Sequence, residues 1–160
     1  MTINIGLNLN GRRLQADVDP RRSLADFLRR DCGTAGVRLG CEHGACGSCT
    51  VEMDGVTARS CLTLAATADG SEITTVEGVA EVGSMSELQQ QLWEHHGLQC
   101  GFCTSGIIMV IREFLRDNPT PDEVQVREAL SSNICRCTGY QNIVDAVLST
   151  VARTAGDTGP

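Results

Sequence analysis

Apolar and polar residues alternate with a period of two along the first half of the chain. This alternation predicts two β-hairpins and one last strand, over residues 3–20, 49–61 and 71–78. The pairs Asn10-Gly11 and Asp54-Gly55 fall at the hairpin tips, where two-residue turns favour Asn-Gly or Asp-Gly. A short helix is predicted over 23–31, with Ser23 as its N-cap. Strands interrupted by a single helix predict an α+β fold of the β-grasp kind.

The period changes to that of an α-helix after Gly83. Apolar residues then recur at intervals of three and four, which predicts helices over 84–97, 104–118, 120–132 and 140–154. Ser86 is expected to cap the first of these helices, and Pro119 to end the second. Four helices in roughly 70 residues predict an all-α four-helix bundle.

This change of period divides the chain into two predicted domains. A strand-rich domain is expected over 1–78 and a helical domain over 85–154, with a linker over 79–84 between them. The last residues, 155–160, are predicted to form a disordered tail.

Composition and charge narrow the class of protein. Only 3 % of the 160 residues are aromatic, which is little for two hydrophobic cores. The nine cysteines could stabilise such small cores by binding metals or by forming disulfides. The formal charge of −7 and the lack of a basic patch argue against nucleic acid and anionic membranes as partners. The longest apolar run, residues 107–111, is too short for membrane insertion, and no secretory signal is seen. We therefore expect a cytoplasmic protein, in which cysteines serve as metal ligands or catalytic groups rather than as disulfides.

A first group of cysteines has the spacing C-x4-C-x2-C, followed by one more cysteine after eleven residues. Its members are Cys41, Cys46, Cys49 and Cys61. This is the spacing of plant-type [2Fe-2S] ferredoxins, in which four thiolates surround a compact cluster. A zinc site with four cysteines is the alternative, although a run of three cysteines with interleaved glycines suits zinc less well. His43, inside the loop, is expected to be solvated, because a Rieske cluster needs two histidines.

A second group of cysteines lies at two predicted turns between helices. Its members are Cys100, Cys103, Cys135 and Cys137, in the pattern C-x2-C…C-x-C. Two turns at one end of a bundle can bring four thiolates together. From the spacing alone, a zinc site and a redox-active C-x-x-C pair remain alternatives to a second iron–sulfur cluster.

Several other residues receive ordinary structural interpretations. Cys32 is expected to act as a small buried apolar residue. His95 and His96 close a helix, where a histidine interacts favourably with the helix dipole. Trp93 is expected in the core or at an interface, and Arg136 in a surface ion pair.

The two cysteine motifs together resemble those of a known family. GCEHGACGSCTV…RSC, GLQCGFCTSG and NICRCTGYQNIV are similar to the small iron–sulfur subunit of the molybdenum hydroxylases, the family of xanthine dehydrogenase, aldehyde oxidoreductase and aerobic carbon monoxide dehydrogenase. The resemblance covers residues 3–152. It implies a plant-type ferredoxin domain followed by a helical domain, with a [2Fe-2S] cluster in each.

The resemblance also implies partners and a direction of electron flow. A large subunit would hold molybdenum on a molybdopterin dinucleotide and oxidise an N-heterocycle, an aldehyde, a purine or carbon monoxide. A medium subunit would hold FAD and receive the electrons, in a complex that can be a dimer of heterotrimers. This chain would transfer electrons between them and carry no catalytic residue.

The resemblance further assigns roles to individual residues. The first cysteine group would bind the distal cluster near the flavin, and the second group the proximal cluster near the pterin. Gln99 and Cys137 occupy the positions that contact the pterin in the family. Ser105 stands where the family has proline, so a residue that can cap is expected to alter the start of the following helix. A free-standing ferredoxin and a zinc-stabilised interaction module are the competing functions, but a plain ferredoxin needs neither the helical half nor Gln99.

Overall fold

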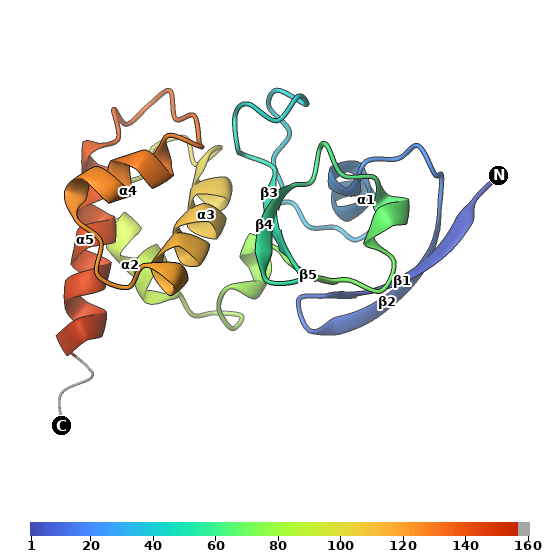
Figure 1. Cartoon of the computed structure of the whole chain (residues 1–160), viewed down its shortest axis with the longest axis horizontal. Coiled ribbons are helices and arrows are strands. Elements are labelled where there is room, and N and C mark those ends of the chain that lie inside the picture. Colours follow the sequence, from blue (N-terminus) through green and yellow to red (C-terminus); the bar gives the residue numbers. More distant parts are fainter. Residues whose placement is uncertain (157–160) are drawn as a thin grey trace.

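A computed structural model of the chain describes residues 1–156. Figure 1 shows a part that contains a sheet and a helical part lying side by side along the longest axis. The five-stranded sheet has the strand order β2-β1-β5-β3-β4. Its strands are β1 (Ile3–Leu9), β2 (Arg12–Val18), β3 (Thr50–Met53), β4 (Val56–Arg59) and β5 (Glu72–Thr74). β1 and β5 run parallel and the other neighbours antiparallel, which confirms the predicted α+β fold.

Both predicted hairpins form around their expected turns. Asn10 and Gly11 have φ angles of 51° and 76°, and Asp54 and Gly55 have φ angles of 53° and 84°. Two successive positive φ angles are what a type I′ turn requires, and its twist matches that of the strands it joins. These turns fix the register of the sheet, because a slip of one residue would move every side chain to the other face.

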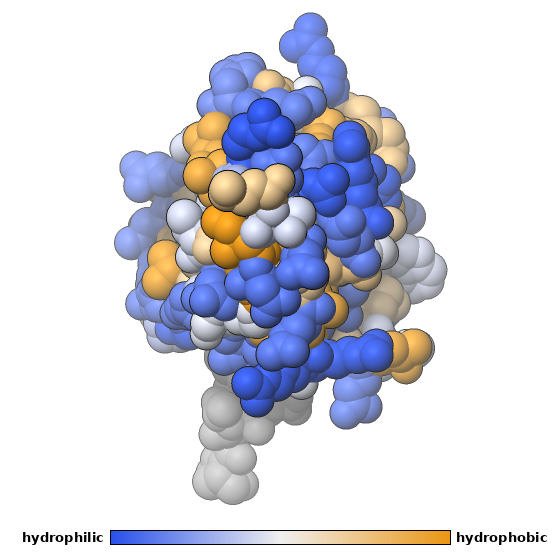
Figure 2. All heavy atoms as spheres, turned by 90° about the vertical axis from the view of Figure 1, so that its right-hand side faces the viewer, coloured by the Kyte–Doolittle hydropathy of each residue, from blue (hydrophilic) through white to orange (hydrophobic). Residues whose placement is uncertain are grey.

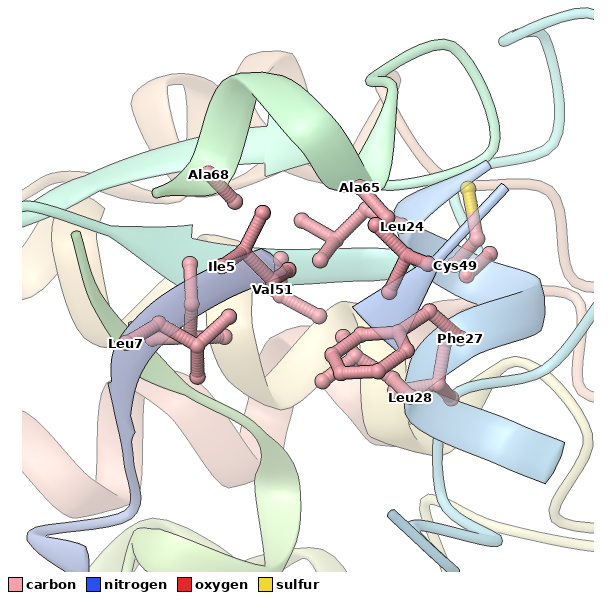
Figure 3. Close-up of a cluster of buried hydrophobic side chains, with 13 residues drawn as sticks. Ile5, Leu7, Leu24, Phe27, Leu28, Cys49, Val51, Ala65 and Ala68 are labelled. Atoms are coloured by element: carbon pink, nitrogen blue, oxygen red, sulfur yellow. The ribbon is translucent and has the colours of Figure 1, made fainter. Parts of the chain in front are cut away.

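One helix and the sheet enclose the first hydrophobic core. α1 (Leu24–Arg30) begins at Ser23, whose hydroxyl accepts a hydrogen bond from the Asp26 N–H, as predicted. Figure 3 shows the side chains that α1 and the strands bury against one another, among them Phe27. Each such large apolar side chain contributes about 1.5–3 kcal/mol when fully buried. Cys49, a member of the first cysteine group, lies in this cluster, so the core positions one candidate ligand directly.

The helical part contains the four predicted helices. They are α2 (Glu87–Glu94), α3 (Thr104–Asp117), α4 (Glu123–Leu130) and α5 (Gln141–Gly156). α2 and α4 both begin with a capping box, at Ser86 and at Asp122, in which side chain and backbone exchange two hydrogen bonds. Buried residues from all four helices form a second core. This arrangement confirms the predicted helical half.

Some element boundaries differ from those predicted. The last strand is short, since β5 ends at Thr74 and a 3₁₀ turn, η2 (Val76–Gly78), follows it. Another 3₁₀ turn, η1 (Ala65–Ala68), lies where the sequence predicted nothing. α5 continues to Gly156 and so includes the first two residues of the tail predicted to be disordered. Residues 157–160 of that tail lie outside the described part of the chain.

Directed contacts join the two parts where α3 packs on β3 and β4. The buried carboxylate of Glu52 lies 2.8 Å from Arg112 Nη1. Glu113 accepts hydrogen bonds from the backbone N–H of Thr57 at 2.9 Å and from its hydroxyl at 2.5 Å. A hydrogen bond to a charged group contributes about 1.5–3 kcal/mol. The relative placement of the two parts is therefore fixed by specific side chains.

The hydropathy of the molecule varies both over its outer surface and along its helices. Figure 2 looks at the end formed by the sheet part, which is mainly hydrophilic with apolar side chains gathered near its centre. None of the helices in residues 1–156 is long and apolar enough to cross a bilayer.

Candidate metal centres

The first cysteine group meets where the loop before β3 approaches the residues after β4. Cys49 is buried, and the other three thiols are half-buried. The backbone N–H of Cys46 points at Cys41 Sγ over 3.3 Å, and the Cys61 thiol is hydrogen-bonded to Cys49. The structure therefore brings together all four cysteines that the spacing selected.

Backbone N–H groups are directed at the sulfurs of this first site. Those of His43 and Cys46 lower the pKa of Cys41 to about 6. Burial raises the pKa of Cys61 to about 11, although the N–H of Gly44 acts in the opposite direction. N–H groups around sulfur stabilise negative charge, as they do around iron–sulfur clusters.

Glycine allows the loop of the first site to be this tight. Gly44 has a φ angle of 85°, and a Cβ built on it would lie 2.6 Å from Leu62 Cδ1. A Cβ on Gly40 would lie 3.3 Å from Cys46 Sγ. Only a residue without a side chain fits at such positions without displacing its neighbours.

The second cysteine group meets at the start of α3 and in the turn between α4 and α5. The Sγ atoms of Cys100 and Cys137 are 3.5 Å apart and exposed. Cys103 is buried and hydrogen-bonded to the thiol of Cys135. The structure thus brings together this second set of four as well.

The thiols of the second site have contrasting surroundings. Burial raises the pKa of Cys103 to about 12. Burial also acts on Cys135, but hydrogen bonds from the hydroxyl and N–H of Thr138 outweigh it and lower the pKa of that thiol. The N–H of Phe102 lowers the pKa of Cys100. The second site therefore has an inner half, with Cys103 and Cys135, and an exposed outer half, with Cys100 and Cys137.

Tyr140 holds the C-x-C turn in place, a role that the sequence reading missed. Its hydroxyl accepts a hydrogen bond from the Cys135 N–H at 2.7 Å and donates one to the Asn133 carbonyl at 2.9 Å. Tyr140 has a φ angle of 70°, which is unusual for a residue other than glycine. The only sequence signal was its place at the end of the motif NICRCTGY.

The eight thiols form four close pairs, two in each site. These pairs are Cys41 with Cys46, Cys49 with Cys61, Cys100 with Cys137, and Cys103 with Cys135. A [2Fe-2S] cluster held by four cysteines takes two thiolates on each iron. Across residues 1–156, no three His, Cys, Asp or Glu side chains converge closely enough to hold a single metal ion. The arrangement of the thiols in two pairs per site fits a dinuclear cluster in each.

The two sites adjoin each other directly. The N–H of Ile134, next to Cys135, donates to the Cys46 carbonyl at 2.9 Å. The ring of Phe102 lies against Gly40, since a Cβ on that glycine would be 3.2 Å from Phe102 Cε1. The loop of the first site thus contacts both turns of the second, and no separate element lies between them.

Several residues outside the two sites occupy the places expected from the sequence. Cys32 packs half-buried against the first core, and burial raises its pKa to about 11. His43 is exposed, with Nδ1 2.7 Å from the Cys41 carbonyl. His95 is the C-cap residue of α2.

The structure narrows the expectation for Trp93 to an interface role, contradicts the ion pair expected for Arg136, and gives Ser105 no capping role. Ser105 does not cap α3, which begins one residue earlier, and its hydroxyl is buried without a hydrogen-bond partner in residues 1–156. Trp93 is 62 % exposed, so it is not a core residue and only an interface role remains. Arg136 is exposed and pairs with no carboxylate in that part of the chain.

Comparison with known proteins assigns a [2Fe-2S]-binding domain to each half of the chain. A family model described as "2Fe-2S iron-sulfur cluster binding domain" matches residues 7–80, and another described as "[2Fe-2S] binding domain" matches residues 75–148. The nicotine 6-hydroxylase small subunit of Paenarthrobacter nicotinovorans is 52 % identical over 98 % of this chain and 94 % of its own. The xanthine dehydrogenase iron–sulfur-binding subunit of Escherichia coli O157:H7 is 44 % identical over 92 % of this chain and 93 % of its own. A chain of quinoline 2-oxidoreductase from Pseudomonas putida 86 superposes with a TM-score of 0.93 at 46 % identity, covering 98 % of both chains.

Proposed function

Because the chain belongs to the family of small iron–sulfur subunits of the molybdenum hydroxylases, we infer that it is the electron-transfer subunit of such an oxidoreductase. It passes electrons from a molybdenum–pterin site on a large subunit toward a flavin subunit. A bound [2Fe-2S] cluster supplies a group that takes up and releases one electron at a time. The observation that carries the proposal is that two complete four-cysteine sites lie in direct contact.

The cysteines of the two sites are proposed as the ligands of two clusters. The first site would use Cys41, Cys46, Cys49 and Cys61, and the second Cys100, Cys103, Cys135 and Cys137. Each thiol must lose its proton to bind iron. The N–H groups around Cys41 favour that loss before metal arrives, whereas buried Cys103 releases its proton only when the metal binds its sulfur.

The second site is proposed to face the pterin of the large subunit. Cys100 and Cys137 are the exposed thiols of this site, and Gln99 beside them is exposed as well. Gln99 and Cys137 would contact the pterin from this edge. The buried position of Cys103 on the other side of the site keeps water from its inner half.

Exposed apolar side chains beside each site support two partner surfaces. Leu62 and Leu64, which follow Cys61, are 63 % and 45 % exposed. Phe102 and Ile134, beside cysteines of the second site, are 43 % and 54 % exposed. Grouped apolar side chains on a surface mark interaction sites. We assign the first pair to the medium FAD subunit and the second pair to the large molybdenum subunit, in a dimer of heterotrimers.

The proposal extends to domains, compartment and substrate class. The first cluster would belong to a domain over 1–78 and the second to a domain over 85–154, with 79–84 as linker. A cytoplasmic location would keep the thiols reduced before iron binds. The relatives named above act on nicotine, xanthine and quinoline by name, so an N-heterocycle is favoured over an aldehyde or carbon monoxide.

Purification of the tagged chain from its own source tests the proposal. Molybdenum, FAD and iron should elute together with the chain, in one complex larger than the chain alone. A red-brown chain that elutes by itself without molybdenum would instead identify a free-standing ferredoxin. Turnover of N-heterocycles by the same preparation would test the substrate class.

A further inference from the structure

Arg59, the last residue of β4, connects the two sites through its side chain. One guanidinium nitrogen donates to the hydroxyl of Thr50, and the other donates to the carbonyl of Ser132 at 2.7 Å. Thr50 is buried, and Arg59 itself is half-buried. The guanidinium therefore lies between β3 and the turn that follows α4.

Each of these contacts lies close in sequence to a candidate iron ligand. Thr50 directly follows Cys49, and Arg59 precedes Cys61 by two residues. Ser132 leads into the turn that carries Cys135. One side chain thus binds two segments that each carry candidate ligands, one from each site.

No carboxylate compensates the positive charge of Arg59 in the described part of the chain. No Asp or Glu oxygen of residues 1–156 comes within 4.0 Å of its guanidinium. Arg112, at the contact between α3 and β3, is different because it pairs with Glu52. A partly buried cation that is bonded only to neutral acceptors is stabilised by a negative charge nearby. An oxidised [2Fe-2S] cluster with four thiolates supplies about −2, from the formal charges of iron, sulfide and thiolate.

We propose that Arg59 is a positioning residue shared by both sites, whose charge raises the reduction potentials of both clusters. Reduction adds one negative charge to a cluster, and a fixed cation nearby stabilises the reduced form more than the oxidised form. The hydrogen bond to the Ser132 carbonyl holds that cation at the turn that leads into Cys135. The inference rests on the proposed function, since it requires a cluster in each site.

The test is a redox titration of the purified complex, followed by electron paramagnetic resonance. In Arg59→Gln, both potentials should fall, each by at least about tenfold in the equilibrium constant for reduction, or ~59 mV for one electron. Arg59→Lys keeps the charge and should stay near the wild-type potentials. Arg13→Gln removes the same charge from an exposed position on the edge strand β2 and should shift neither cluster.

Two results of this comparison overturn the inference. One is an Arg59→Gln complex with wild-type potentials, and the other is an equal shift in Arg59→Lys and Arg59→Gln, which would indicate a purely structural role. If Arg59→Gln loses iron, Lys and Nε-acetyl-lysine at position 59 are compared, because they share a stem and differ in charge. Equal potentials in that pair overturn the inference. A wild-type complex without two cluster signals would overturn the proposed function itself.

Discussion

At the scale of single residues, each site combines thiols whose environments differ sharply. Cys41 accepts N–H hydrogen bonds that lower its pKa to about 6, whereas burial raises the pKa of Cys61 to about 11. The second site repeats this contrast between Cys135, whose pKa is lowered, and buried Cys103, whose pKa is raised to about 12. Thiols of low pKa are present as thiolates at neutral pH, and thiolates are the form that binds metal.

This contrast predicts the order of alkylation in the iron-free, reduced chain. At pH 7 Cys41 is mostly thiolate and Cys61 almost entirely thiol, so iodoacetamide should modify Cys41 roughly tenfold to a hundredfold faster, after allowance for its lower nucleophilicity. Below pH 6 the rate for Cys41 should fall, because Cys41 then gains its proton, whereas the advantage over Cys61 should shrink only as the pH rises toward about 11, where Cys61 loses its proton. Mass spectrometry of the peptides measures both rates. Equal rates for the two thiols at pH 7 would contradict the assigned environments.

Removal of a single ligand should affect one site alone. Cys137→Ser removes an exposed thiol of the second site, and we expect loss of its spectroscopic signal with the first signal retained. Iron should fall from about four to about two per chain, at two per cluster. Cys32→Ser is the matched control, because Cys32 packs outside both sites and should leave iron and both signals unchanged. Survival of both signals in Cys137→Ser would show the ligand assignment to be wrong.

At the scale of elements, the sequence predicted the turns and helix ends that depend on residues close together in the chain. Asn10-Gly11 fixes a turn through its own φ angles, and Ser86 caps a helix through a residue three positions away. The cysteine sets were likewise marked by spacing and by family motifs. The functions of Arg59 and Tyr140 could not be predicted, because their partners become neighbours only after the fold forms. Ser105 was misread for the same reason, since burial against the rest of the chain overrides its capping preference.

The contact between α3 and the first loop predicts the effect of one glycine. Gly106 lies in α3, and a Cβ there would sit 2.2 Å from the Gly47 carbonyl oxygen. Helix propensity favours alanine by about 1 kcal/mol, but overpacking costs about 1–3 kcal/mol. We expect Gly106→Ala to lower the free energy of unfolding by up to about 2 kcal/mol net and to weaken iron retention.

Gly156 offers a matched control for this substitution. It also lies in a helix, as the last residue of α5, and a Cβ on it would meet no atom of residues 1–156 within 4 Å. Gly156→Ala should therefore be neutral or slightly stabilising in the same denaturant titration. Equal stability of the two variants would mean that α3 and the first loop do not pack as closely as described.

At the scale of the whole molecule, we propose that the two sites face different partners. Leu62 and Ile134 are both more than half exposed, and they flank different sites. Two partner surfaces separated in this way would let electrons enter at one site and leave at the other. The contact between Ile134 and Cys46 joins the sites within one rigid assembly.

A charged substitution beside each site should therefore weaken the binding of one partner and leave the other bound. Leu62→Glu should weaken binding of the FAD subunit by at least about tenfold, and Ile134→Glu that of the molybdenum subunit, because each buries a charge in an apolar contact. Val124→Glu, on exposed α4, should affect neither. FAD and molybdenum in the purified complexes report the two losses independently. Loss of both partners in either variant would contradict the assignment of separate surfaces.

The central claim, two [2Fe-2S] clusters in one small chain, is tested most directly by iron quantification with electron paramagnetic resonance of the fully reduced protein. The account predicts about four irons per chain, at two per cluster, and two distinct signals of equal intensity. A single signal with about two irons per chain would contradict it, because the second four-cysteine site would then not hold a cluster.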